Sequence, residues 1–112
     1  MKPHDRIRIR HMIEAATTIA GFVKGRERQE LDSDVLLAFA LIRAIEIFGE
    51  AASRITPETR SAITDLPWLA IVGMRNRLVH VYFDVDHDIL WKAATDEIPS
   101  LVPILRSLVA ED

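Results

Sequence analysis

Side chains able to bind anions or transfer protons gather between residues 73 and 84, in the stretch "GMRNRLVHVYFD". Arg75 and Arg77 carry guanidinium groups, whose planar fork of donors fits phosphate oxygens. His80 titrates near neutral pH, so it can accept and return a proton, and Asn76 can orient a group by hydrogen bonding. This set suits cleavage of a phosphodiester in RNA, where a 2′-hydroxyl loses a proton and charge builds on the phosphate oxygens. A histidine beside an arginine on a helix is more often structural than catalytic, so the spacing alone does not establish an enzyme.

The elements that would position these side chains are predicted to be helical. Pro67 is expected to begin a helix over about 67–82, on which successive residues are about 100° apart. Gly73, Asn76 and His80 then form one polar wall, with Gly73 allowing a backbone or ligand to approach closely. Arg75 lies about 140° from His80 but nearly in line with Tyr82, two turns further on. Whether the Arg75 side chain reaches the His80 ring is left open by the spacing.

A second polar group lies on the helix predicted over about 33–53. Arg43, Glu46, Glu50 and Arg54 follow one another at steps of three or four residues, so they share one face. They form either a self-neutralising ion ladder or a carboxylate held ready for a cation on a neighbouring helix. Which of Glu46 and Glu50 faces the site is open, and we expect Glu50 to support Arg75 or His80.

The apolar period along the rest of the chain is also helical. It predicts an all-α, up-and-down bundle of four long helices plus one short helix, in one domain spanning residues 1–112. Asp32 or Ser33 is expected to cap the second helix, Thr56 the short one, and Asp84 or Asp86 the last one. Pro99 and Pro103 predict that the last helix is kinked or split near 96–99. The first helix is expected over about 5–24, and Gly25 is expected to end it.

Composition limits the function classes. The chain has 112 residues, 49% of them apolar, no cysteine and a net charge of −3. Disulfides and cysteine-based zinc sites are excluded, and the absence of a long apolar run or signal-like N-terminus predicts a soluble, cytoplasmic protein without membrane contact. Residues 1–28 carry seven basic and three acidic side chains, whereas residues 83–112 carry two and seven. A polyanion would therefore be bound by a local patch.

The run "RNRLVHVY" resembles the R-x4-H-x-Y motif of the HEPN superfamily in its HepT-like branch, the toxin half of the HepT–MntA toxin–antitoxin pair. "AIEIFGEAA", "LPWLAIVGMRNRLVH", "YFDVDHDILW" and "DEIPSLVPIL" are similar to that branch in order and spacing, so the resemblance covers roughly residues 5–109. It implies a homodimer that joins two motifs and a ribonuclease that needs no metal or other cofactor. Arg75 and His80 would be the catalytic pair, with Asn76 in support. Tyr82 matches the tyrosine that a nucleotidyltransferase antitoxin modifies with AMP.

Two alternatives accompany this interpretation. His80, Asp84, Asp86 and His87 are a conceivable metal site, although "DVDHD" is explained more simply as a helix cap with negative charge near the positive helix end. The second functional class is a non-catalytic, dimeric helical module that binds a nucleotide or docks a nucleotidyltransferase. In that module Arg75 and His80 would hold a phosphate without cleaving it.

Overall fold

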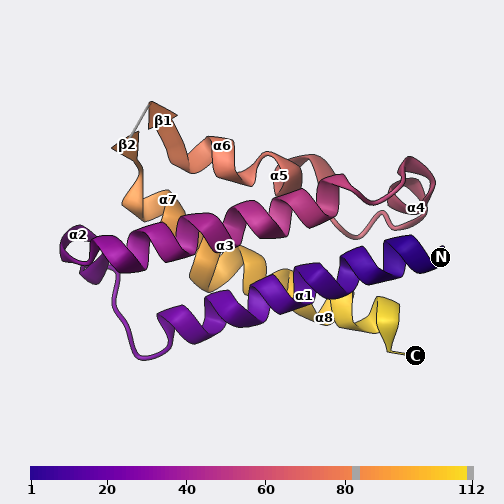
Figure 1. Ribbon diagram of the computed structural model, residues 1–112, viewed down its shortest axis with the longest axis horizontal. Helices are drawn as coiled ribbons and strands as arrows, with labels where there is room; N and C mark the ends of the chain where they lie inside the picture. Colours follow the sequence, from indigo (N-terminus) through magenta and orange to yellow (C-terminus); the bar gives the residue numbers. More distant parts are fainter. Residues whose placement is uncertain (82–83, 111–112) are drawn as a thin grey trace.

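The computed structural model describes residues 1–81 and 84–110. Three long helical stretches form the body, and short elements join them along one side (Figure 1). The elements are α1 (Pro3–Val23), α2 (Glu30–Ser33), α3 (Val35–Ser53), α4 (Pro57–Ala62), α5 (Trp68–Val72), α6 (Met74–Leu78), β1 (Val79–Val81), β2 (Asp84–Val85), α7 (His87–Lys92), the π-helical turn η1 (Ala93–Glu97) and α8 (Ile98–Val109).

The core lies where α1 and α3 pack antiparallel against each other and α8 covers α1 (Figure 1). One apolar stripe of each helix is fully buried there, as the helical period predicted. Gly25 ends α1 with a φ of 71°, a conformation that glycine adopts without strain. The fully buried side chains include Ile9, Met12, Ile19, Leu41, Ile45, Phe48, Leu90, Ile98 and Leu105.

The predicted all-α class and the divided last helix are confirmed. The chain from α7 to α8 contains the π-helical turn η1, which ends two residues before Pro99, where the proline was expected to disturb the helix. Thr56 and Asp86 cap α4 and α7 as predicted. The cap of α3 is neither Asp32 nor Ser33 but Asp34, whose Oδ1 accepts from the Leu37 N–H at 3.0 Å.

The predicted fourth long helix, 67–82, is wrong. Its first part, α5, ends at Gly73, whose N–H donates to the Leu69 carbonyl oxygen at 3.0 Å. The next helix, α6, ends at Leu78. Beyond it β1 pairs antiparallel with β2, Val79 facing Val85 in the register. Glycine weakens a helix interior, and the β-branched Val79 and Val81 favour extended backbone. The pairing of β1 with β2 therefore replaces the last turn of the predicted helix.

Candidate functional site

Gly49 in the second half of α3 lets the α5–α6 segment approach closely. A Cβ at this position would stand 3.2 Å from the carbonyl oxygen of Ile71 and 3.6 Å from that of Val72. The α5 backbone therefore rests directly on α3, and Arg75 and Asn76 come over the face of α3 that bears its acidic side chains. Of the polar ridge predicted on the second helix, Glu46 and Glu50 thus face the segment with the motif.

Arg75 forms an ion pair with Glu46. The Arg75 Nε lies 3.3 Å from Glu46 Oε2, and Arg75 Nη1 donates to Asn76 Oδ1 at 3.5 Å. About half of the Arg75 side chain stays exposed, at 49%. The guanidinium is thus oriented from one side and open to solvent on the other. The interpretation of the ridge as a carboxylate held for a neighbouring cation is confirmed, with Glu46 rather than Glu50 as the partner of Arg75.

These residues line a shallow cavity of about 240 Å³, which we call the Arg75 cavity. Glu50 and Ser53 stand on its α3 side, and Asn76 lies beside Arg75 on the α6 side. Glu50 is therefore part of the same site without being the ion-pair partner. The residues of the Arg75 cavity are Ile45, Glu46, Gly49, Glu50, Ser53, Val72, Arg75 and Asn76.

The structure separates Arg77 from Arg75. Arg77 Nη1 lies 3.8 Å from Glu97 Oε2, and the residue lines a different cavity against α7, η1 and α8. Gly73 ends α5 and does not line the Arg75 cavity. Of the predicted polar wall, only Asn76 therefore faces the site among the residues whose side chains the structure describes.

His80 and Tyr82 cannot be placed as the helix prediction had them. The His80 backbone is extended within β1, so its predicted angular position on a continuous helix does not apply. Tyr82 lies outside the described residues. The alignment of Arg75 with Tyr82, two helical turns apart, loses its basis because α6 ends at Leu78.

The acidic stretch after β1 caps a helix. Asp86 Oδ1 accepts from the Ile89 N–H at 3.0 Å, and the His87 ring lies 2.8 Å from Asp32 Oδ1. Hydrogen bonding to His87 and Arg28 lowers the pKa of Asp32. Among the side chains that the structure describes, which exclude those of residues 79–83, no group of three or more acidic or histidine side chains is arranged to hold a metal ion. Within residues 1–81 and 84–110, none of the helices combines the length and hydropathy needed to cross a membrane.

Sequence analysis missed the burial of Asp5. This carboxylate is fully buried near the start of α1 and accepts hydrogen bonds from Thr56 N at 2.9 Å, Thr56 Oγ1 at 2.6 Å and Thr59 Oγ1 at 2.5 Å. Burial opposes its ionisation, but the bonds from Thr56 and Thr59 outweigh burial and hold the pKa of Asp5 well below its ordinary range. The cluster ties α1 to α4, and no periodicity signals it.

Known proteins resemble the chain over most of its length. It matches the family described as "Ribonuclease HepT-like" over residues 12–108. It is 35% identical to "Probable ribonuclease HepT" of Thermococcus cleftensis over 101 residues, 90% of this chain and 92% of that one. It is 31% identical to "Putative RNase TTE0752" of Caldanaerobacter subterraneus subsp. tengcongensis over 104 residues, 93% of each chain. No solved structure matches it significantly. The chain therefore belongs to the HepT-like ribonuclease family.

Proposed function

We propose that the protein is a toxin-component endoribonuclease that cleaves RNA without a metal ion, with Arg75 and His80 as the catalytic residues. The observation that carries the proposal is the half-exposed Arg75 guanidinium, held 3.3 Å from Glu46 at the rim of a cavity that Asn76 also lines. Family membership supports the substrate class. The R-x4-H spacing adds His80 as the proton carrier.

The chemistry follows from the two side-chain types. Neutral His80 takes the proton of a ribose 2′-hydroxyl, and the 2′-oxygen attacks the adjacent phosphorus. The bond from phosphorus to the 5′-oxygen breaks, and that oxygen leaves with a proton from a second imidazolium. The products are a 2′,3′-cyclic phosphate and a 5′-hydroxyl. Arg75 donates to the phosphate oxygens as their charge grows, which stabilises the transition state more than the ground state.

The second imidazolium is proposed to be His80 of the partner subunit in a homodimer, which gives an acid and a base from one residue type. Exposed apolar side chains on α1 and α3 support such an assembly. Leu36 is 80% exposed and Phe39 62%, and Phe22 and Val35 lie at the same end of the α1–α3 pair. Apolar side chains clustered on a surface are typical of protein–protein contacts. We call these four residues the apolar patch.

Silencing is proposed to act through Tyr82, two residues beyond His80. A partner nucleotidyltransferase, the antitoxin, would attach AMP to the Tyr82 hydroxyl with release of pyrophosphate from ATP. The attached phosphate and nucleoside would occupy the place of the RNA substrate. This step rests on the R-x4-H-x-Y motif and on family membership.

The test uses purified full-length protein and RNA in the presence of a chelator. Wild type should produce fragments that end in cyclic phosphate, while Arg75→Ala and His80→Ala should lose at least about a hundred-fold in rate, the usual contribution of a general base or charge stabiliser. Tyr82→Phe should cleave like wild type and remain active after incubation with the antitoxin and ATP. Absence of cleavage by wild type, or equal cleavage by His80→Ala, would favour the non-catalytic module that binds nucleotides.

A further inference from the structure

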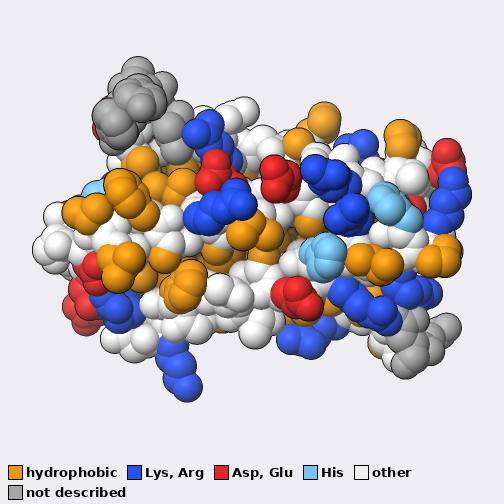
Figure 2. All heavy atoms as spheres, viewed as in Figure 1, with side chains coloured by type: hydrophobic (Ala, Val, Ile, Leu, Met, Phe, Trp, Pro, Cys, Tyr) orange, Lys and Arg blue, Asp and Glu red, His pale blue; other side chains and the backbone are white. Residues whose placement is uncertain are grey.

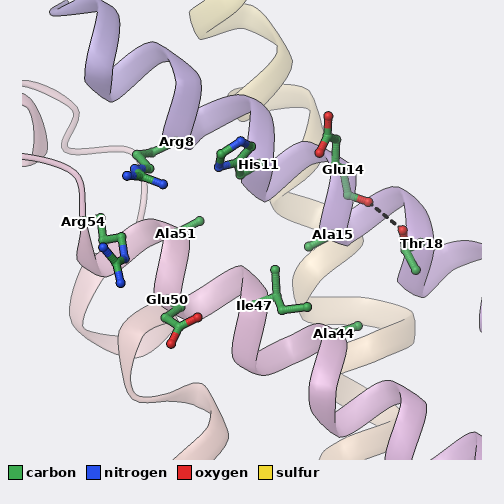
Figure 3. A pocket seen from close by; sticks show the side chains of 10 residues that line it. All are labelled: Arg8, His11, Glu14, Ala15, Thr18, Ala44, Ile47, Glu50, Ala51 and Arg54. Carbon is green, nitrogen blue, oxygen red and sulfur yellow. Dashed lines mark hydrogen bonds between the residues drawn. The ribbon is translucent and has the colours of Figure 1, made fainter.

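A second pocket lies on the other side of α3, between α3 and α1 (Figure 3). Its volume is about 390 Å³, larger than that of the Arg75 cavity and within the range of small-ligand sites. Small apolar side chains, Ala15, Ala44 and Ala51, form its floor together with Ile47. We call it the α1–α3 pocket; its remaining residues are Arg8, His11, Glu14, Thr18, Glu50 and Arg54.

Basic side chains surround one end of the α1–α3 pocket. Figure 3 shows Arg8 and His11 from α1 on one side and Arg54, at the end of α3, on the other, whereas Glu14 and Thr18 lie toward the opposite end. Thr18 Oγ1 donates to the Glu14 carbonyl at 3.0 Å. The Glu14 carboxylate points away from α3 (Figure 3). The Glu50 carboxylate lies near Arg54 (Figure 3), but the two arginines outnumber it, so this end keeps the net positive charge that favours an anion.

The two arginines of this end lack acceptors. The Arg8 Nε is buried without a hydrogen-bond partner, and within the described part of the chain neither the Arg8 nor the Arg54 guanidinium forms a hydrogen bond or an ion pair. Arg26, by contrast, binds Glu30 and Asp34, at 2.7 and 2.6 Å, whereas the Arg60 Nε, outside this pocket, is also buried without a partner. A buried donor without an acceptor is costly to the fold, and a bound anion would remove that cost.

Phosphate is the anion that suits this pocket. A guanidinium fork matches two phosphate oxygens, and two arginines on opposite sides of a pocket, with a histidine, can share three. The apolar floor next to them is suited to the face of a ribose or base rather than to a bare ion. The composition of the pocket thus fits a phosphate group with an attached nucleoside.

The α1–α3 pocket adjoins the proposed catalytic site. Glu50 lines both the pocket and the Arg75 cavity, so the two lie on either side of the second half of α3. Figure 2 shows basic and histidine side chains gathered over the half of the molecule that holds the N-terminus. A strand that crosses α3 at Glu50 would reach both sites, and the carboxylates of Glu46 and Glu50 would keep its phosphates toward the two basic ends.

We propose that the α1–α3 pocket binds a backbone phosphate of single-stranded RNA, separately from the bond cleaved at Arg75 and His80. The proposal rests on the proposed function for the identity of the polymer. Arg8 and Arg54 hold the phosphate oxygens, His11 donates a further hydrogen bond, and the neighbouring nucleoside lies on the apolar floor. The pocket therefore fixes the register of the strand relative to Arg75.

The test measures binding without cleavage. A fluorescein-labelled, unstructured oligoribonucleotide is titrated into His80→Ala protein in chelator, and the anisotropy gives Kd at several salt concentrations. Arg8→Gln and Arg54→Gln should each weaken binding about ten-fold and reduce the slope of log Kd against log salt by about 0.7, the value for one phosphate on a single strand. Arg106→Gln is the matched control, because Arg106 is exposed on α8 and does not line the pocket. Its Kd and slope should stay close to those of the parent.

The outcomes separate the two proposals. If wild type does not cleave RNA but Arg8→Gln still weakens RNA binding, the proposed function is wrong and the phosphate site is supported. Cleavage by wild type, with Arg8→Gln and Arg54→Gln binding RNA as tightly as Arg106→Gln, would remove the phosphate site and keep the proposed function. The phosphate site for RNA would also be overturned if Arg8→Gln and Arg54→Gln bound AMP more weakly than the parent but bound RNA as tightly. If Arg8→Gln lowers the melting temperature, Arg54→Gln decides, since Arg54 is exposed.

Discussion

Gly49 of α3 and Ile71 of α5 are in backbone contact, with 3.2 Å between the carbonyl oxygen of Ile71 and the place where a Cβ of residue 49 would stand. This close approach brings the motif segment onto α3 and sets the distance between Arg75 and Glu46. The position of the proposed catalytic arginine thus depends on a glycine in another helix, twenty-six residues earlier in the sequence.

Gly49→Ala should destabilise the protein and displace Arg75. The methyl group must push back a backbone carbonyl, and overpacking of this kind costs about 1–3 kcal/mol, which exceeds the gain of about 1 kcal/mol in helix propensity. Gly21→Ala is the matched control, because a Cβ there meets nothing within 4 Å and should stabilise α1. Denaturant unfolding of both variants measures the difference. Equal stabilisation by both would show that α5 does not rest on Gly49.

Glu46→Gln should lower the cleavage rate several-fold with little change in stability. The ion pair with Arg75 is partly exposed, and such pairs contribute under about 1 kcal/mol to the free energy of unfolding. Its role is to orient the guanidinium toward the cavity. Glu50→Gln is the control, since Glu50 lines the same cavity without pairing with Arg75. Cleavage rates at saturating RNA, together with melting temperatures, distinguish loss of orientation from loss of fold; a larger loss with Glu50→Gln would reverse the assignment.

Which of Glu46 and Glu50 pairs with Arg75 shows what can and what cannot be predicted from the sequence. Residues four apart differ by only about 40° on a helix, so periodicity places both carboxylates on the same face. What selects Glu46 is the place where α5 crosses α3, and the contact at Gly49 sets that crossing. The ridge was predictable, because it follows from local spacing. Its partner was not, because it follows from a contact between segments far apart in the chain.

Some helix ends were likewise predictable from local sequence, and others depend on contacts between distant segments. Thr56 and Asp86 were predictable caps, since each precedes a helical period and its side chain bonds to the backbone three residues on. The end of α6 at Leu78 was not, because "RNRLVHVY" continues the apolar period of a helix, and pairing of Val79 with Val85 decides otherwise. Of the residues that the sequence singled out, Arg75, Asn76 and Glu50 line one cavity, but the sequence misjudged the backbone that carries His80.

Asp5→Asn should destabilise the protein by about 2 kcal/mol at neutral pH. Asparagine cannot accept all three hydrogen bonds from Thr56 and Thr59, and an unsatisfied buried group costs about 1–3 kcal/mol. The pKa of Asp5 is lowered in the folded state, so its contribution is complete above the unfolded value of about 4 and is lost as the pH falls below it. Urea unfolding at pH 7 and near pH 3 should show a gap between wild type and Asp5→Asn that narrows in acid. A gap independent of pH would contradict an ionised Asp5.

Phe39→Glu should convert the proposed homodimer into a monomer. Phe39 is 62% exposed in the middle of the apolar patch, so a charge there costs little in the isolated chain but would be buried in an interface of two copies. Leu69→Glu is the matched control, because Leu69 is 88% exposed on α5, outside the patch. Sedimentation over a range of concentrations should show a dimer for wild type and Leu69→Glu and a monomer for Phe39→Glu. Because the second imidazolium is proposed to come from the partner subunit, the Phe39→Glu monomer should also lose RNA cleavage; a monomer that cleaves like wild type would show that one chain holds the complete site.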